Sequence, residues 1–118
     1  MVDFLRGRVL YAHDSMERFH AVYLDAERSF LGDAPMGEGC TDSLSVRMRD
    51  VIGRALKLDA QSILIAHNHP SGDCHPSQID VEATARLKRV AEALDIELLD
   101  HLIVTQDAVY SMRAGEYL

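Results

Sequence analysis

The sequence predicts an α/β domain in which a mixed β-sheet is flanked by helices. Three observations support this fold class. The chain has 118 residues, of which 47% are hydrophobic, so it can bury a core without disulfide bonds. Short strand-like segments alternate with two amphipathic helical segments, and no internal repeat or linker interrupts them. We therefore expect residues 1–118 to form a single domain.

The first half of the chain predicts a hairpin followed by a loop. Near the amino terminus only residues 9–11 are strand-like. Alternating apolar side chains over 19–24 predict a strand, the polar run 25–28 predicts a turn, and 29–31 would return as the partner strand. Residues 32–43 are expected to form a loop, since glycine and proline recur there at Gly32, Pro35, Gly37 and Gly39.

The second half of the chain predicts two helices and three strands. Apolar residues at helical spacing indicate an amphipathic helix over 48–56, and the apolar segment 62–66 indicates a short buried strand. A second helix is expected over 77–94, where the first residue is a serine that suits the N-cap. Residues 96–104 and 108–112 supply the last strands. The order of hairpin, helix, strand, helix, strand and strand indicates a mixed sheet with helices packed against it.

The composition argues against several classes of function. Twelve Lys and Arg residues against nineteen Asp and Glu give a net charge of −7 and a pI near 5.2, which disfavours unspecific binding to nucleic acid. No apolar stretch approaches the ~20 residues that span a bilayer, so a membrane protein is not expected. Cys40 and Cys74 form no C-x-x-C pair, and no secretory leader is visible, which predicts a cytoplasmic protein.

The only dense cluster of metal-ligand side chains in the sequence lies between the short strand and the second helix. His67 and His69 are two residues apart on an extended segment, so both imidazoles can point to the same side. Asp80 lies in the first turn of the helix, from which its carboxylate can reach the same point. Two imidazoles and one carboxylate suit Zn²⁺ with a fourth position open for water, which is typical of a catalytic site.

The same residues also have structural explanations. Ser77-x-x-Asp80 is close to a capping box, in which the two side chains stabilise a helix start without any metal. An isolated H-x-H pair is often a surface or core feature, and His75 is either a competing ligand or a surface residue. Only the combined spacing of the histidine pair, the serine and the aspartate favours a metal site.

This spacing resembles a known motif. H-x-H, seven residues, Ser, two residues and Asp is similar to the JAMM motif of the JAB/MPN metalloproteases, here formed by His67, His69, Ser77 and Asp80. The segment 67–73, with the sequence HNHPSGD, and the later string 99–104, with the sequence LDHLIV, resemble the RadC-like branch of that superfamily. The resemblance covers roughly residues 17–118.

The resemblance implies a fold and a set of ligands. The fold would be a cytidine-deaminase-like α-β-α sandwich. His67, His69 and Asp80 would bind zinc, and Ser77 would help to stabilise a tetrahedral intermediate. Longer RadC-like proteins carry a helix-hairpin-helix segment before this domain, and the 118 residues leave no room for one.

The resemblance also implies a glutamate that activates water. Glu17 stands directly before the first predicted strand, which is the matching place, and Glu38 and Glu27 are the alternatives. A carboxylate near the metal can take a proton from water and pass it to a leaving amine. Asp100 and His101 fit the family string, and we expect them to serve hydrogen bonding rather than catalysis.

Three functions follow from these observations. We expect a zinc hydrolase that cuts an amide bond, either a peptide or an isopeptide bond, in a peptide or protein substrate. A DNA-associated module of the RadC type is an alternative, which the net charge of −7 and the missing amino-terminal segment oppose. A non-catalytic MPN scaffold that binds protein partners is another, although such scaffolds typically lack the ligands that this chain retains. The sequence leaves the natural substrate and the oligomeric state open.

Overall fold

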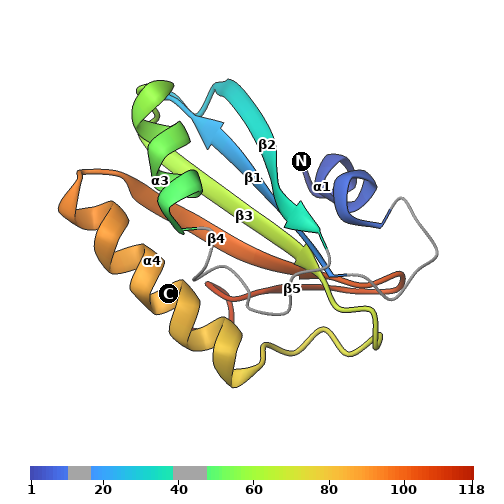
Figure 1. Cartoon of the computed structure of the whole chain (residues 1–118). Coiled ribbons are helices and arrows are strands. Elements are labelled where there is room, and N and C mark those ends of the chain that lie inside the picture. Colours follow the sequence, from blue (N-terminus) through green and yellow to red (C-terminus); the bar gives the residue numbers. More distant parts are fainter. Residues whose placement is uncertain (11–16, 39–47) are drawn as a thin grey trace.

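A five-stranded sheet lies between helices in the computed structural model of the protein, which describes residues 1–10, 17–38 and 48–118 (Figure 1). The elements in chain order are α1 (Val2–Val9), β1 (Arg18–Leu24), β2 (Phe30–Glu38), α3 (Met48–Lys57), β3 (Ser62–Asn68), α4 (Gln78–Ala93), β4 (Glu97–Val104) and β5 (Val109–Ser111). The predicted α/β class with a mixed sheet is confirmed.

The sheet contains one parallel pair of strands within the described residues. Its strand order is β2-β1-β3-β4-β5, and β3 and β4 run parallel while the other neighbours run antiparallel. Parallel neighbours need a crossover connection, and α4 supplies it. β1 and β2 form the predicted hairpin.

Helices cover both faces of the sheet. α1 packs on one face, where Leu5 and Val9 join Val22 in one buried cluster. α3 and α4 pack on the other face, over alternate residues of the same strand such as Phe19 and Ala21. The fold is therefore the expected α-β-α sandwich. None of the helices in the described residues is both long and apolar enough to cross a membrane.

The amino terminus is helical, so the strand expected to start at residue 9 does not form. α1 places Leu5 and Val9 one helical turn apart, and both side chains are fully buried against the sheet. This spacing has the helical period, but the segment is too short to repeat it and the pattern is therefore weak in the sequence. Residue 11 lies outside the described residues.

β2 extends to Glu38, so the loop expected over 32–43 is wrong for its first part. β2 is an edge strand, and an edge can hold Pro35 although proline has no N–H for pairing. One extra residue of β2 lies between the pairs Arg18–Glu38 and His20–Pro35, which is the irregularity of a β-bulge. Residues 39–43 lie outside the described residues.

Several elements converge at the carboxyl end of β3. β3 continues through His67 and Asn68, two residues beyond the predicted strand, so the sheet holds His67 in place. Antiparallel pairing sets Phe19 of β1 opposite His67, and Glu17 therefore lies just beyond this end of the sheet. Ligand sites of α/β sheets commonly lie outside the carboxyl ends of parallel strands.

Candidate metal centre

Four potential metal ligands meet beyond the carboxyl end of β3. Three parts of the chain contribute them: the residue before β1, the end of β3 with the loop that follows, and the first turn of α4. One ligand atom from each side chain lies within 4.8 Å of the others in the group Glu17, His67, His69 and Asp80. The structure thus brings together the three side chains expected to bind metal and the glutamate expected to activate water.

His67 is the most constrained side chain of the cluster. It is fully buried, and its ring stacks on Phe19 with centroids 4.5 Å apart. Its Nε2 atom lies 3.4 Å from Asp80 Oδ1 and 3.5 Å from Glu17 Oε1. Among the described residues it is nevertheless the one buried side-chain nitrogen or oxygen without a hydrogen bond. An unpaired buried polar atom costs about 1–3 kcal/mol, so a cation between this nitrogen and the two carboxylates fits the site.

His69 is oriented through its other ring nitrogen. The backbone carbonyl of Asp73 lies 2.7 Å from Nδ1, and since a carbonyl only accepts hydrogen bonds, Nδ1 carries a proton. Nε2 then faces Asp80 Oδ2 at 3.0 Å. The hydrogen bond with Asp80 raises the pKa of His69, and burial opposes this rise. Ligating histidines are commonly anchored in this way through the nitrogen that does not bind the metal.

Asp80 connects the cluster to the start of α4. The Asp80 amide donates to Ser77 Oγ at 3.1 Å, and the Ser77 amide donates to Asp80 Oδ2 at 2.9 Å. This is the predicted capping box, and it fixes the carboxylate beside the two imidazoles. Burial alone would raise the pKa of Asp80, but His67, His69 and the Ser77 amide hold it well below its ordinary value. One carboxylate therefore both caps the helix and faces the metal cluster.

Glu17 lies on the open side of the cluster. Its side chain is 29% exposed, whereas those of His67 and Asp80 are buried. The neighbouring Arg18 amide donates a hydrogen bond to Asn68 Oδ1 at 2.6 Å, which fixes the backbone next to Glu17. Burial raises the pKa of Glu17; the nearby imidazoles oppose this rise, and the Asp80 carboxylate adds to it.

Two of the alternative residues, Glu27 and His75, lie outside this cluster. Glu27 is in the turn after β1, at the opposite end of that strand from Glu17. The side chain of Glu38 lies outside the described residues. His75 is exposed, and its Nδ1 pairs with Asp73 Oδ1 at 2.7 Å. Neither Glu27 nor His75 is part of the group of four.

Two buried residues that sequence reasoning did not connect with the site lie next to His67. His101 Nε2 is 2.6 Å from His67 Nδ1, and Thr84 Oγ1 is 2.7 Å from His101 Nδ1. Burial lowers the pKa of His101 well below its ordinary value, and His67 lowers it further. His101 was expected to serve hydrogen bonding, and its partner is a candidate ligand. The sequence could show only that residues 101 and 103 share a face of their strand, whereas the pairing of Ile103 with His67 comes from the structure.

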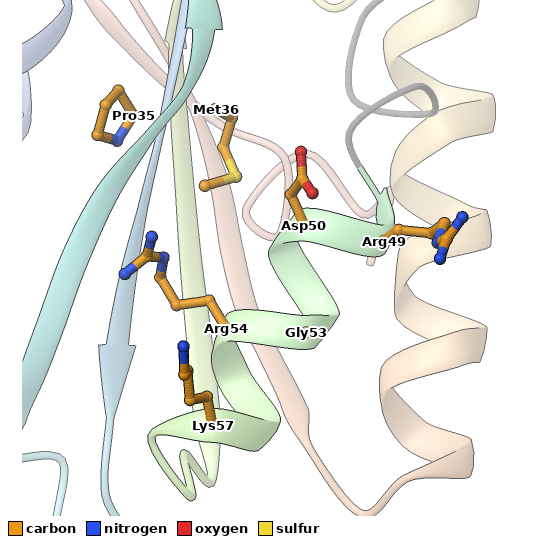
Figure 2. Close-up of a pocket in the computed structure, with 7 residues that line it drawn as sticks. All are labelled: Pro35, Met36, Arg49, Asp50, Gly53, Arg54 and Lys57. Carbon is orange, nitrogen blue, oxygen red and sulfur yellow. The ribbon is translucent and has the colours of Figure 1, made fainter.

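A separate pocket of about 390 Å³ lies between β2 and α3 (Figure 2). Figure 2 shows Arg54 and Lys57 extending from α3 toward the strands of the sheet, while Arg49 extends toward α4. Among the described residues, Asp50 is the one acidic residue of the lining. Arg54 and Lys57 lie in the last turn of α3, where the helix dipole favours positive charge without any ligand.

Comparison with known proteins identifies a family whose domain agrees with the fold. Residues 1–117 match the RadC-like JAB domain family. The chain is 42% identical over 107 residues to UPF0758 protein SPO0054 of Ruegeria pomeroyi, a match that covers 91% of this chain and 48% of that protein. It is 40% identical over 103 residues to a UPF0758 protein of Rhodobacter capsulatus, with 87% and 48% covered. It is 39% identical over 111 residues to UPF0758 protein STH371 of Symbiobacterium thermophilum, with 94% and 47% covered.

The chain spans about half the length of the curated relatives that it matches. Its 118 residues therefore say nothing about whether a helix-hairpin-helix segment accompanies the domain. The family match extends over nearly the whole chain, and it includes the cluster of two histidines and two carboxylates. The chain belongs to the RadC-like JAB domain family.

Proposed function

We propose that this domain is a zinc-dependent hydrolase that cleaves an amide bond, peptide or isopeptide, in a peptide or protein substrate. The observation that carries the proposal is the buried Nε2 of His67, which faces the carboxylates of Glu17 and Asp80 without a hydrogen bond. Imidazole nitrogen and carboxylate oxygen together suit Zn²⁺, whereas Mg²⁺ and Ca²⁺ prefer oxygen ligands alone. His67, His69 and Asp80 would hold the ion. When bound, zinc supplies Lewis-acid chemistry, polarising a carbonyl group and lowering the pKa of water.

Glu17 is suited to move the proton in this reaction. Amide hydrolysis adds the oxygen of water to the carbonyl carbon, breaks the C–N bond and places a proton on the leaving nitrogen. Glu17 Oε1 would accept a proton from the attacking water and deliver it to that nitrogen. Its raised pKa supports this role, because a general base works best when its pKa approaches the operating pH. Its partial exposure leaves it accessible to substrate.

Ser77 is suited to contact the substrate oxygen that gains negative charge. Its Oγ accepts the Asp80 amide in the capping box, so the hydroxyl proton remains able to donate. The residue is exposed at the start of α4, on the same side as the cluster. A donor placed where charge develops stabilises the transition state.

The two other functions considered have less support. A non-catalytic scaffold does not require an unpaired buried nitrogen beside two carboxylates, which is an unfavourable arrangement unless a cation binds. A DNA-associated module needs positive surface potential, whereas the chain carries a net charge of −7. Arg54 and Lys57, which line the pocket between β2 and α3, are accounted for by their place in the last turn of α3.

The decisive experiment combines metal analysis with cleavage. Elemental analysis of the purified protein should find one zinc per chain, and chelation should abolish cleavage of a peptide or isopeptide library. Glu17→Gln should retain the zinc and lose cleavage by about 10²–10⁴-fold, the usual contribution of a general base. Glu27→Gln is the matched control, since it makes the same change at the other end of β1 and should leave cleavage unchanged.

The outcomes separate the alternatives. A native protein without zinc would favour the scaffold. A Glu17→Gln variant that loses zinc would make Glu17 a ligand rather than the base. Full activity in Glu17→Gln would contradict the role of Glu17 as the base. Retention of the protein on duplex DNA that weakens steeply with salt would revive the DNA-associated module.

A further inference from the structure

A line of fully buried polar atoms runs from the cluster into the core between β3, β4 and α4. His67 Nδ1 lies 2.6 Å from His101 Nε2, and His101 Nδ1 lies 2.7 Å from Thr84 Oγ1. Thr84 Oγ1 also lies 3.7 Å from Met112 Sδ, where it can donate. All four side chains have no exposed surface, so water cannot replace a missing partner.

The proton arrangement in this line decides whether His67 can bind a metal. A neutral imidazole carries one proton, and the nitrogen without it is the ligand. His67 Nε2 faces the cluster, so it can coordinate only when the proton lies on Nδ1. For His69 a backbone carbonyl fixes this form, because the carbonyl can only accept. For His67 the partner is a second imidazole, which can either donate or accept.

Thr84 resolves this ambiguity. If His101 carries its proton on Nδ1 and donates it to Thr84 Oγ1, then His101 Nε2 accepts from His67 Nδ1. The Thr84 hydroxyl proton is then directed to Met112 Sδ. In the reverse arrangement Thr84 donates to His101, His101 donates to His67, and a proton remains on His67 Nε2, where it blocks coordination.

We infer that Thr84 and His101 are positioning residues that hold His67 in the form with its proton on Nδ1 and its Nε2 free to bind metal. The inference rests on the proposed metal site and adds two residues to it. Both side chains are fully buried, so neither can contact a substrate, and both act through His67 alone. Partners of this kind typically change metal affinity by about 10–100-fold when they are removed.

Three variants test the inference. Thr84→Val keeps the shape of the side chain and removes the hydroxyl, so zinc affinity should fall by about 10–100-fold in a chelator competition. Thr84→Ser keeps the hydroxyl and should restore the affinity. Thr105→Val is the matched control, because Thr105 is buried as well but its hydroxyl bonds only with Ala108, and its affinity should match wild type. Thermal melts of the metal-free proteins check that each variant is folded.

Nitrogen NMR of the histidine side chains gives a readout independent of activity. In the zinc-loaded wild type, His67 and His101 should both carry their protons on Nδ1. In metal-free Thr84→Val, the ring nitrogen shifts of His67 should change although the Thr84 hydroxyl bonds with His101 and Met112 rather than with that ring, whereas Thr105→Val should leave them unchanged.

The results distinguish this inference from the proposed function. A wild-type protein that binds no zinc overturns the proposed function, and the metal-free shifts of His67 still test the line of hydrogen bonds. Wild-type zinc affinity in Thr84→Val, a proton on Nε2 of zinc-bound His67, or unchanged His67 shifts in metal-free Thr84→Val would each overturn the inference.

Discussion

The side-chain oxygen of Asn68 accepts a hydrogen bond from the backbone amide of Arg18 across 2.6 Å, and this bond joins the carboxyl end of β3 to the amino end of β1. Both residues are buried. Arg18 directly follows Glu17 in the chain, and Asn68 stands between His67 and His69. The bond therefore sets the distance between the proposed base and the proposed ligands.

Replacing Asn68 with alanine should separate catalysis from metal binding. The buried Arg18 amide loses this acceptor, so we expect a loss of about 1–3 kcal/mol in the free energy of unfolding. The start of β1 loosens, and kcat should fall because Glu17 is no longer held in place, while the zinc content stays near one per chain. Urea denaturation, zinc analysis and kinetics on the same preparation measure the free energy of unfolding, the zinc content and kcat. Loss of zinc with unchanged kcat per bound zinc would contradict this role.

The two roles of Asp80 should be separable by substitution. Asp80→Asn keeps an oxygen that can accept the Ser77 amide but removes the negative charge, so zinc affinity should fall by more than about 100-fold, beyond the usual effect of an indirect partner. Ser77→Ala removes the helix cap and should cost about 1 kcal/mol of stability while zinc remains bound.

Chelator competition and denaturation of the metal-free proteins compare the two variants. If Asp80→Asn bound zinc as wild type does and lost as much stability as Ser77→Ala, the carboxylate would serve the helix alone.

Zinc binding should weaken as the pH falls, starting above the ordinary histidine pKa of about 6.5. The hydrogen bond that His69 donates to Asp80 raises the pKa of His69, so in the metal-free protein His69 keeps a proton to higher pH, and this proton competes with the metal. Affinities measured between pH 8 and pH 5.5 report the competition. His75→Ala is the control, because this exposed histidine lies outside the cluster and should leave the pH profile unchanged.

A profile for zinc affinity that is flat over this range would contradict the competition between His69 protonation and metal binding. A profile that changes in His75→Ala would instead place His75 at the site.

The metal-free protein should lose stability below about pH 6.5 because of His101. Burial holds the pKa of His101 well below its ordinary value, so in acid the unfolded chain binds a proton that the folded chain does not. The sign follows from linkage: the stability contribution falls as the pH falls, by up to about 1.4 kcal/mol per pH unit for one proton.

The variant His101→Gln, which lacks this group, isolates the effect. Urea denaturation of both proteins from pH 7.5 to pH 5 gives a difference curve in which the contribution of His69 and the other groups largely cancels. A wild-type stability that fell no faster with acid than that of the variant would argue against a neutral buried His101.

The long elements and the ligand spacing were predictable from the sequence, whereas short and edge elements were not. The apolar stripe of α3 repeats over enough turns to be recognised in the sequence. The start of α4 is marked by a serine that suits the N-cap. α1 shows its buried face only at Leu5 and Val9, and too few turns are present for a period to stand out. β2 contains Pro35, which indicates a loop unless the strand is known to lie at the edge of the sheet.

The cluster was predictable where its members are close in sequence. His67, His69 and Asp80 fall within fourteen residues, so spacing alone brings them to one point. Glu17 could be named only through the family resemblance, because its place in the cluster depends on the pairing of β1 with β3. Thr84 and His101 required both the parallel pairing of β3 with β4 and the packing of α4, which a single sequence does not reveal.

The position of His101 on β4 has a consequence for partial chains. A fragment that stops before Glu97 would contain every residue of the four-membered cluster, yet it would lack the imidazole that contacts His67 from inside the core. Such a fragment could bind zinc only as a loose peptide does. During synthesis, the ligands emerge well before β4, the strand whose His101 orients His67. The chain can therefore bind zinc tightly only after β4 has been made.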